Sequence, residues 1–291
     1  MTGLPIVVGI DGSDSALEAA RWAADEAARK RASLRLVSVV HVPVAGSYVG
    51  DVGLGFDMTE DLRAESQRML EQARSALVEQ QPELNVATTV LVGPAIPSLV
   101  EESSVAGLMV VGSRGLGGFR GMLVGSTAVA LASRGRCPVA VIRGSGGRSG
   151  PVVVGVDGSA TSDAAVELAF EEASVRGAEL VAVHTWLEQG SDAARTAAVE
   201  SAIGGDAAST RGMRALAERL AGWAEKYPDV TVVRRVVSGR PIVNLLAAAA
   251  DAQLLLVGSR GRGAFAGVVL GSTSQALVYH APCPLIVVRG Q

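Results

Sequence analysis

The feature that most constrains the fold is a long internal repeat. The sequence VVGIDGS at residues 7–13 returns as VVGVDGS at 153–159, and VVGSRGLGGFRGMLVGST at 110–127 returns as LVGSRGRGAFAGVVLGST at 256–273. Both pairs are displaced by the same 146 residues, so the two halves of the chain keep one register without a net insertion. Solenoid repeats have periods of only about 20–50 residues. The repeat therefore predicts two homologous domains in tandem.

The segment between the two halves predicts where the domains meet. Residues 145–150 consist of Ser, Gly and Arg, a composition typical of a flexible linker. We expect a first domain over residues 1–144 and a second domain over residues 151–291. A chain of 291 residues is long enough for two domains of ordinary size, each with a core of its own.

Charge and composition narrow the range of possible functions. The formal net charge is −3, which argues against a general basic surface for nucleic acid or anionic lipid. No apolar run approaches the roughly 18 residues that a membrane span requires, and the N-terminus lacks the features of a signal peptide. We therefore expect a cytoplasmic protein with no nucleic-acid partner and no membrane span.

Glycine is abundant in this chain, whereas lysine is nearly absent. There are 35 glycines, but only Lys30 and Lys226 among the 26 basic residues are lysines. Because no glycine is followed directly by lysine, the sequence contains no P-loop. Chemistry through a Schiff-base lysine is also disfavoured, because both lysines lie in predicted helices far from the glycine clusters.

Each half alternates segments typical of strands and of helices. In the first half, apolar and β-branched runs predict strands at 6–10, 34–42, 86–92, 108–112 and 139–143. Helices are predicted at 13–31, 59–80, 97–104 and 125–133, with a glycine-rich loop through Gly55 before the second of them. The alternation predicts an α/β fold with two tandem doubly wound, Rossmann-like domains. Each would hold a five-stranded parallel sheet with helices on both faces, and would bind ligands beyond the carboxyl ends of its strands.

A glycine pattern follows the fourth predicted strand in both halves. In the first half it runs Gly112-Ser-Arg-Gly115, then nine residues, then Gly125-Ser-Thr, and the second half repeats this spacing. Glycines directly after a strand let the backbone approach a ligand closely. A helix that starts at Gly-Ser-Thr offers free backbone N–H groups at its positive end. Together these features predict a phosphate site, with Arg114 and Arg260 as nearby cations. The alternative is that the pattern is only a flexible loop followed by an ordinary helix cap. This alternative explains less well why the pattern occurs twice with the same spacing.

With these motifs the chain resembles the tandem universal stress proteins, specifically the branch with the ATP-binding pattern G-x2-G-x9-G-[ST], which is intact in both halves. The resemblance covers nearly the whole chain. It implies one ATP in each domain, with Mg²⁺ on the phosphates, and a cytoplasmic regulatory role under stress or growth arrest. It also implies that the last strands of the halves pair across a two-fold axis and that two chains form a homodimer. It indicates no particular protein partner.

The resemblance assigns the ligand to matching positions in the two domains. The triphosphate is expected on the glycine pattern and the nucleoside near the ends of the first two strands, while the two aspartates serve the nucleoside or, through water, Mg²⁺. In the first domain the expected residues are Gly9, Asp11, Val39, Gly112, Ser113, Arg114, Gly115, Leu116, Gly117, Gly118, Gly125, Ser126 and Thr127. In the second domain they are Gly155, Asp157, Thr185, Gly258, Ser259, Arg260, Gly261, Arg262, Gly263, Ala264, Gly271, Ser272 and Thr273.

Other candidates for chemistry have weaker patterns. Cys137 and Cys283 occupy equivalent positions, each before a proline, and cannot form a CxxC site, so we expect buried free thiols. His41, His184 and His280 do not share a position across the repeat, which argues against a metal site or a Ser-His-Asp arrangement. We therefore predict no catalytic residues and no direct protein ligand for a metal.

Three functions are compatible with the sequence. The favoured one is a non-catalytic ATP-binding regulator. The second is a slow ATPase or phosphotransferase, which would have no general base beyond Asp11 and Asp157. The third is a dimeric scaffold with vestigial sites, against which the intact glycines in both halves argue. A dinucleotide-binding Rossmann domain fits less well, because the first strand leads into GIDGSD rather than G-x-G-x-x-G.

Overall fold

The computed structural model describes residues 3–41, 54–115, 124–143, 149–186, 207–261 and 270–289. Within it the chain divides into two units, Met1–Ile142 and Arg143–Gln291. Most of the predicted linker at 145–150 lies outside the described residues. The two units are described separately below.

The two units contain the same succession of strands and helices. The first has β1 (Ile6–Gly9), α1 (Asp14–Lys30), β2 (Leu34–Val40), α2 (Leu54–Gln80), β3 (Val86–Val92), α3 (Ala95–Glu102), the 3₁₀ turn η1 (Ser103–Val105), β4 (Leu108–Gly112), α4 (Ser126–Arg134) and β5 (Val139–Ile142). The second has β6 (Val152–Gly155), α5 (Ala160–Arg176), β7 (Leu180–Trp186), α7 (Ala207–Lys226), β8 (Val232–Ser238), α8 (Pro241–Ala248), β9 (Leu254–Gly258), α9 (Ser272–His280) and β10 (Leu285–Val288).

The strands of each unit pair in parallel. Their order is β3-β2-β1-β4-β5 in the first unit and β8-β7-β6-β9-β10 in the second. The first strand of each unit is central: β1 pairs with both β2 and β4, and β6 pairs with both β7 and β9. The chain therefore extends the sheet in one direction from the central strand and then returns to extend it in the other. This topology confirms the predicted doubly wound α/β fold.

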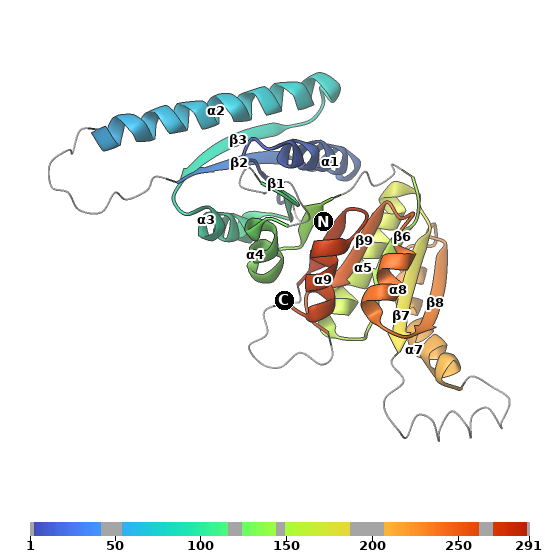
Figure 1. Cartoon of the computed structure of the whole chain (residues 1–291). Helices are drawn as coiled ribbons and strands as arrows, with labels where there is room; N and C mark the ends of the chain where they lie inside the picture. Colours follow the sequence, from blue (N-terminus) through green and yellow to red (C-terminus); the bar gives the residue numbers. More distant parts are fainter. Residues whose placement is uncertain are drawn as a thin grey trace. The chain divides into compact units, whose positions relative to one another are not determined.

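Helices cover both faces of each sheet (Figure 1). In the first unit α1 contacts α2 and α3 contacts α4, and in the second α5 contacts α7 and α8 contacts α9. The central strands β1, β4, β6 and β9 and the last strands β5 and β10 are apolar and almost wholly buried, as parallel strands covered on both faces must be, whereas β3 and β8 are partly exposed. Helix α1 can lie close to its sheet because its buried face consists mainly of small side chains, namely Ala16, Ala19, Ala20, Ala23, Ala24 and Ala27.

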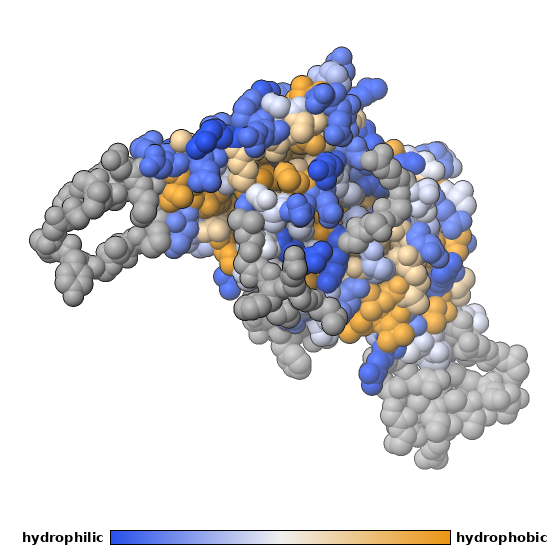
Figure 2. Space-filling view, turned by 45° about the horizontal axis from the view of Figure 1, so that its top comes forward, coloured by the Kyte–Doolittle hydropathy of each residue, from blue (hydrophilic) through white to orange (hydrophobic). Residues whose placement is uncertain are grey.

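Helix α2 differs from the sequence prediction at its start. It begins at Leu54 rather than at 59, so Gly55 belongs to the helix, and residues 42–53 of the predicted loop lie outside the described residues. Its charged residues pair along the exposed surface, Arg63 with Glu60 and Arg74 with Glu71. Hydrophilic side chains accordingly predominate over the outer surface of α2 (Figure 2). None of the described helices combines the length and the apolar character that crossing a membrane requires.

Both cysteines are free and buried, as the sequence predicts. Each lies in the turn that leads into the last strand of its unit. Burial raises the pKa of the Cys137 thiol and of the Cys283 thiol to about 12, because the apolar surroundings disfavour the thiolate. Neither thiol is therefore a nucleophile at neutral pH.

Candidate functional site

Each unit has a cavity at the carboxyl ends of its central strands, where the strand order reverses. The first lies over the ends of β1, β2 and β4 and has a volume of about 490 Å³. The second lies over the ends of β6, β7 and β9 and has a volume of about 460 Å³. Doubly wound sheets bind their ligands in this crevice.

These cavities bring together most of the residues predicted from the sequence. The first is lined by Gly9, Asp11, Val39, Gly112, Arg114, Gly115, Gly125, Ser126 and Thr127, among others. The second is lined by Gly155, Asp157, Thr185, Gly258, Arg260, Gly261, Gly271, Ser272 and Thr273, among others. The predicted residues that lie outside the described part of the chain are Leu116, Gly117, Gly118, Arg262, Gly263 and Ala264.

Two predicted residues, Ser113 and Ser259, do not line the cavities. Their side chains are buried, with 4% and 1% of the residue exposed. Their backbone instead closes the loop, because the carbonyl oxygens of Ser113 and Ser259 accept hydrogen bonds at 2.8 Å from the N–H groups of Gly125 and Gly271. The nine-residue spacing of the glycine pattern thus brings its last glycine back beside its first.

Hydrogen bonds connect the start of the first helix in each unit to the glycine pattern that follows β4 or β9. In the second unit Asp157 Oδ1 accepts hydrogen bonds from the N–H and the hydroxyl of Ser159, at 2.9 and 2.7 Å. The Ser159 hydroxyl also lies 3.1 Å from the carbonyl oxygen of Arg260, to which the Thr161 hydroxyl donates at 2.5 Å. Asp11 and Ser13 repeat the first pair of bonds in the other unit, at 3.0 and 2.6 Å. The aspartate is therefore held rigidly at the mouth of the cavity.

Packing within the protein explains several of the glycines. A Cβ at Gly258 would lie 2.6 Å from Thr161 Oγ1 and 2.8 Å from the backbone nitrogen of Ser162, so glycine is required for α5 to approach β9. A Cβ at Gly155 would lie 3.2 Å from Leu245 Cδ2 and 3.3 Å from Val257 Cγ1. The space beside Gly155 is thus already bounded closely by protein side chains.

The glycine at the start of α4 and of α9 has no such explanation. A Cβ at Gly125 would meet nothing closer than 3.7 Å, and one at Gly271 nothing closer than 3.4 Å. Their φ angles of −61° and −70° suit any residue. Both are N-cap residues, yet no side chain caps either helix. Helices α1 and α5, by contrast, are capped by Ser13 and Ser159, whose side chains accept hydrogen bonds from N–H groups of the first turn.

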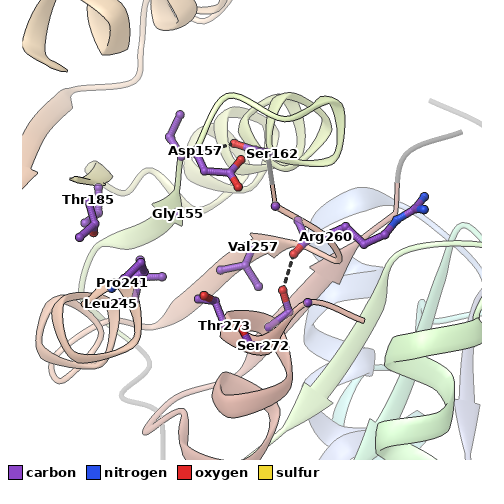
Figure 3. A pocket seen from close by; sticks show the side chains of 16 residues that line it. Gly155, Asp157, Ser162, Thr185, Pro241, Leu245, Val257, Arg260, Ser272 and Thr273 are labelled. Carbon is purple, nitrogen blue, oxygen red and sulfur yellow. Dashed lines mark hydrogen bonds between the residues drawn. The ribbon is translucent and has the colours of Figure 1, made fainter. Parts of the chain in front are cut away.

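The end of each cavity away from the start of α4 or α9 is apolar, and its residues were not predicted from the sequence. In the second unit it is formed by Leu245 and Pro241 from α8, beside the predicted Thr185, while Val257 from β9 lies nearer the middle of the view (Figure 3). Leu99, Ala95 and Val111 are the counterparts in the first unit. The residues from α3 and α8 belong to no motif, because the folding of these helices over the strand ends is what brings them to the cavity.

The close view of the second cavity separates its two ends. Ser272 and Thr273 lie at one end and Thr185 at the other, and Gly155 and Asp157 lie above them in this view (Figure 3). The side chain of Arg260 extends away from Val257 and Thr185 (Figure 3). In this structure, therefore, the guanidinium of Arg260, predicted as a nearby cation, does not face the cavity.

Comparison with known proteins places this chain in a family. The model of the universal stress protein family matches the chain twice, over residues 4–143 and 149–289. Universal stress proteins Rv2005c and Rv2623 of Mycobacterium tuberculosis are each 38% identical to it, over 301 residues (98% of this chain and 96% of the relative) and 300 residues (99% and 97%), respectively. The chain therefore belongs to the universal stress protein family and contains two tandem copies of its domain. The crystal structure of a universal stress protein from Archaeoglobus fulgidus shares the fold along the whole length of both chains, with a TM-score of 0.71 and 21% identity.

Proposed function

We propose that each domain binds one ATP in its cavity and that the protein is a nucleotide-dependent regulator of stress response or growth arrest in the cytoplasm. The observation on which this rests is the start of α4 and of α9. In both helices the N-cap is a glycine that no packing contact or backbone angle requires, and it lines the cavity.

The uncapped helix start suits the phosphates. The first N–H groups of a helix have no partner within the helix and lie at the positive end of its dipole. Serine or aspartate at the N-cap would satisfy one of these groups and stabilise the helix. Because glycine has no side chain, Gly125 and Gly271 leave the first N–H groups of α4 and α9 available to a ligand in the cavity. An anion that accepts several N–H bonds, such as a polyphosphate, matches this arrangement.

The rest of the cavity suits a nucleoside. The apolar side chains of Leu245 and Pro241 offer a contact surface to a base at the end away from α9, and Val257 adds to it nearer the middle of the cavity. Asp157, held by Ser159 between the two ends, would accept hydrogen bonds from ribose hydroxyls or bind, through water, a Mg²⁺ ion that enters with the phosphates. In the first unit Asp11 occupies the same position.

The side chains favour binding over turnover. Among the described lining residues, the aspartate is the one carboxylate in each cavity, and neither cavity is lined by a histidine, lysine or cysteine. A carboxylate already fixed by two hydrogen bonds from serine is a weak candidate for a general base. Regulation would then follow from whether the sites are filled, with two chains associating as a homodimer.

Isothermal titration with ATP and Mg²⁺ tests the proposal, with Gly125→Asp and Gly271→Asp as variants. Aspartate at these N-caps would cap the helix and place a negative charge where the phosphates bind. We expect two ATP per chain for the wild type, one for each single variant and none for the double variant, without loss of thermal stability. Gly222→Asp, at an exposed position of α7 with open space around it, is the charge-matched control and should bind two.

Two results would overturn the proposal: a wild type that takes up no ATP and carries none through purification, or a double variant that binds like the wild type. Sustained ATP hydrolysis over many turnovers would favour the enzyme instead. Light scattering at micromolar concentration tests the dimer separately, and a monomer mass would exclude it.

A further inference from the structure

The two cavities of this chain differ at matched positions. Three lining residues that are apolar in the first unit carry a hydroxyl in the second. The pairs are Ala16 and Ser162, Val39 and Thr185, and Ala128 and Ser274. The other matched lining residues that the structure describes are identical or both apolar, so among the described residues these hydroxyls are the main chemical difference that a bound molecule would meet.

Two of the three hydroxyls already serve the backbone of the second unit. Ser162 Oγ accepts a hydrogen bond at 3.1 Å from the N–H of Asp157, and Ser274 Oγ donates at 2.6 Å to the carbonyl oxygen of Gly258. Both serine residues are buried, with 2% and 4% of the residue exposed. These hydroxyls therefore hold the strand ends in place.

The third hydroxyl, that of Thr185, is placed differently. Thr185 is half-buried near the end of β7, and no residue that the structure describes hydrogen-bonds to its side chain. It lies beside Pro241 and Leu245, at the end of the cavity away from Ser272 and Thr273 (Figure 3). A molecule with its phosphates at the start of α9 would therefore present the edge of its base to Thr185. Val39 at the matching place in the first unit has no hydrogen-bonding group.

We propose that the hydroxyl of Thr185 makes the second site selective for the exocyclic amino group of adenine, whereas the first site has no side-chain hydroxyl at the matching position, Val39. This inference rests on the proposed ATP binding. The threonine oxygen accepts a hydrogen bond from the amino group, and the apolar surroundings of Leu245 and Pro241 exclude the water that would otherwise compete. The two sites of one chain would then differ in how strictly they distinguish ATP from other purine nucleotides.

Titrations with ATP and with purine riboside 5′-triphosphate, which lacks only the amino group, test this inference. Each site is measured alone, the second in the Gly125→Asp background and the first in the Gly271→Asp background. At the second site we expect ATP to bind roughly three- to tenfold more tightly than the analogue, the range of one neutral hydrogen bond. At the first site the two affinities should agree within about twofold.

Substitutions then assign the difference to the hydroxyl. Thr185→Val should weaken ATP binding to the level of the analogue and leave the analogue unchanged, whereas Thr185→Ser should retain the preference. Val39→Thr should create a preference at the first site. An equal ratio of the affinities for ATP and the analogue at both sites would overturn this inference, as would an equal loss of affinity for both nucleotides in Thr185→Val. Either result would leave the proposal of ATP binding standing. A wild type that binds neither nucleotide would overturn the proposed function and this inference together.

Discussion

The carboxylate of Asp157 occupies the space that a side chain at Gly261 would need. A Cβ built on Gly261 would lie 2.6 Å from Asp157 Oδ2. In the other domain, a Cβ built on Gly115 would lie at the same distance from Asp11 Oδ2. The aspartate cannot turn away freely, because its Oδ1 is held by the N–H and the hydroxyl of Ser159. The glycine of the loop and the aspartate after the first strand are therefore coupled in each domain.

Gly261→Ala should disturb the second domain through this contact. The new methyl group must push the carboxylate off Ser159, so we expect a loss of stability of about 1 kcal/mol or more. Asp157→Ala removes the obstacle, and adding Gly261→Ala to it should then cost less than in the wild type. Urea unfolding of the four proteins of this double-mutant cycle measures the coupling, expected at ~0.5–3 kcal/mol. Additive losses would show that the two residues do not interact.

A buried ion pair in α5 should matter far more than an exposed one in α7. Glu172 and Arg176 approach to 3.2 Å with 0% and 3% of their side chains exposed, whereas Glu218 and Arg214 lie at 2.9 Å with 64% and 82% exposed. Removing one partner of a buried pair leaves an uncompensated charge and costs about 3–5 kcal/mol. Exposed pairs contribute about 1 kcal/mol or less. Denaturant unfolding of Glu172→Ala and Glu218→Ala should show this contrast, and equal losses would contradict it.

The two buried thiols predict a loss of stability in alkali. Burial raises the pKa of Cys137 and of Cys283 from 9.0 to about 12, so between these values the unfolded chain releases thiol protons that the folded chain retains. Stability should therefore be unaffected by the thiols below pH 9 and should fall as the pH rises above it. The expected slope is at most about 1.4 kcal/mol per thiol and pH unit.

Thermal unfolding of the wild type and of a Cys137→Ala/Cys283→Ala variant between pH 8 and 11 isolates this effect from other alkaline titrations. The difference in stability between the two proteins should narrow as the pH rises. Iodoacetamide at neutral pH should label both cysteines of the unfolded chain and neither in the folded one. A native chain that reacts as quickly as the unfolded chain would contradict the burial of the thiols.

The sequence predicts the strands more accurately than the helix starts. β3 and β4 coincide with their predicted ranges, because their runs rich in apolar and β-branched residues are bounded by turn residues at which the strands end. The prediction for α3 is shifted, since Pro97 suggested the first helical residue, whereas Pro94 is the N-cap and the helix begins at Ala95. Pro97 is compatible with the first turn, where the backbone N–H has no helical partner in any case.

The site shows a similar division between local and tertiary information. The glycine pattern and Asp157 are local signals, and the fold brings them to one cavity. The residues that the sequence did not reveal, such as Leu245 and Pro241, reach the cavity only because α8 packs over the ends of β6 and β7. Ser259 differs from its neighbours in the motif, since its side chain is buried and does not line the cavity, and its contact with the ligand stays a prediction.

If each domain binds ATP as proposed, the glycine N-caps of α4 and α9 would also connect the lifetime of the protein to the energy state of the cell. ATP that bonds to these helix starts would bind the folded chain and not the unfolded one. At a concentration about a hundred times the dissociation constant it would add about 2.7 kcal/mol for each site. Starvation that empties the sites would withdraw this contribution and increase the fraction of chains open to proteases. The abundance of the protein would then report the ATP supply before any partner is engaged.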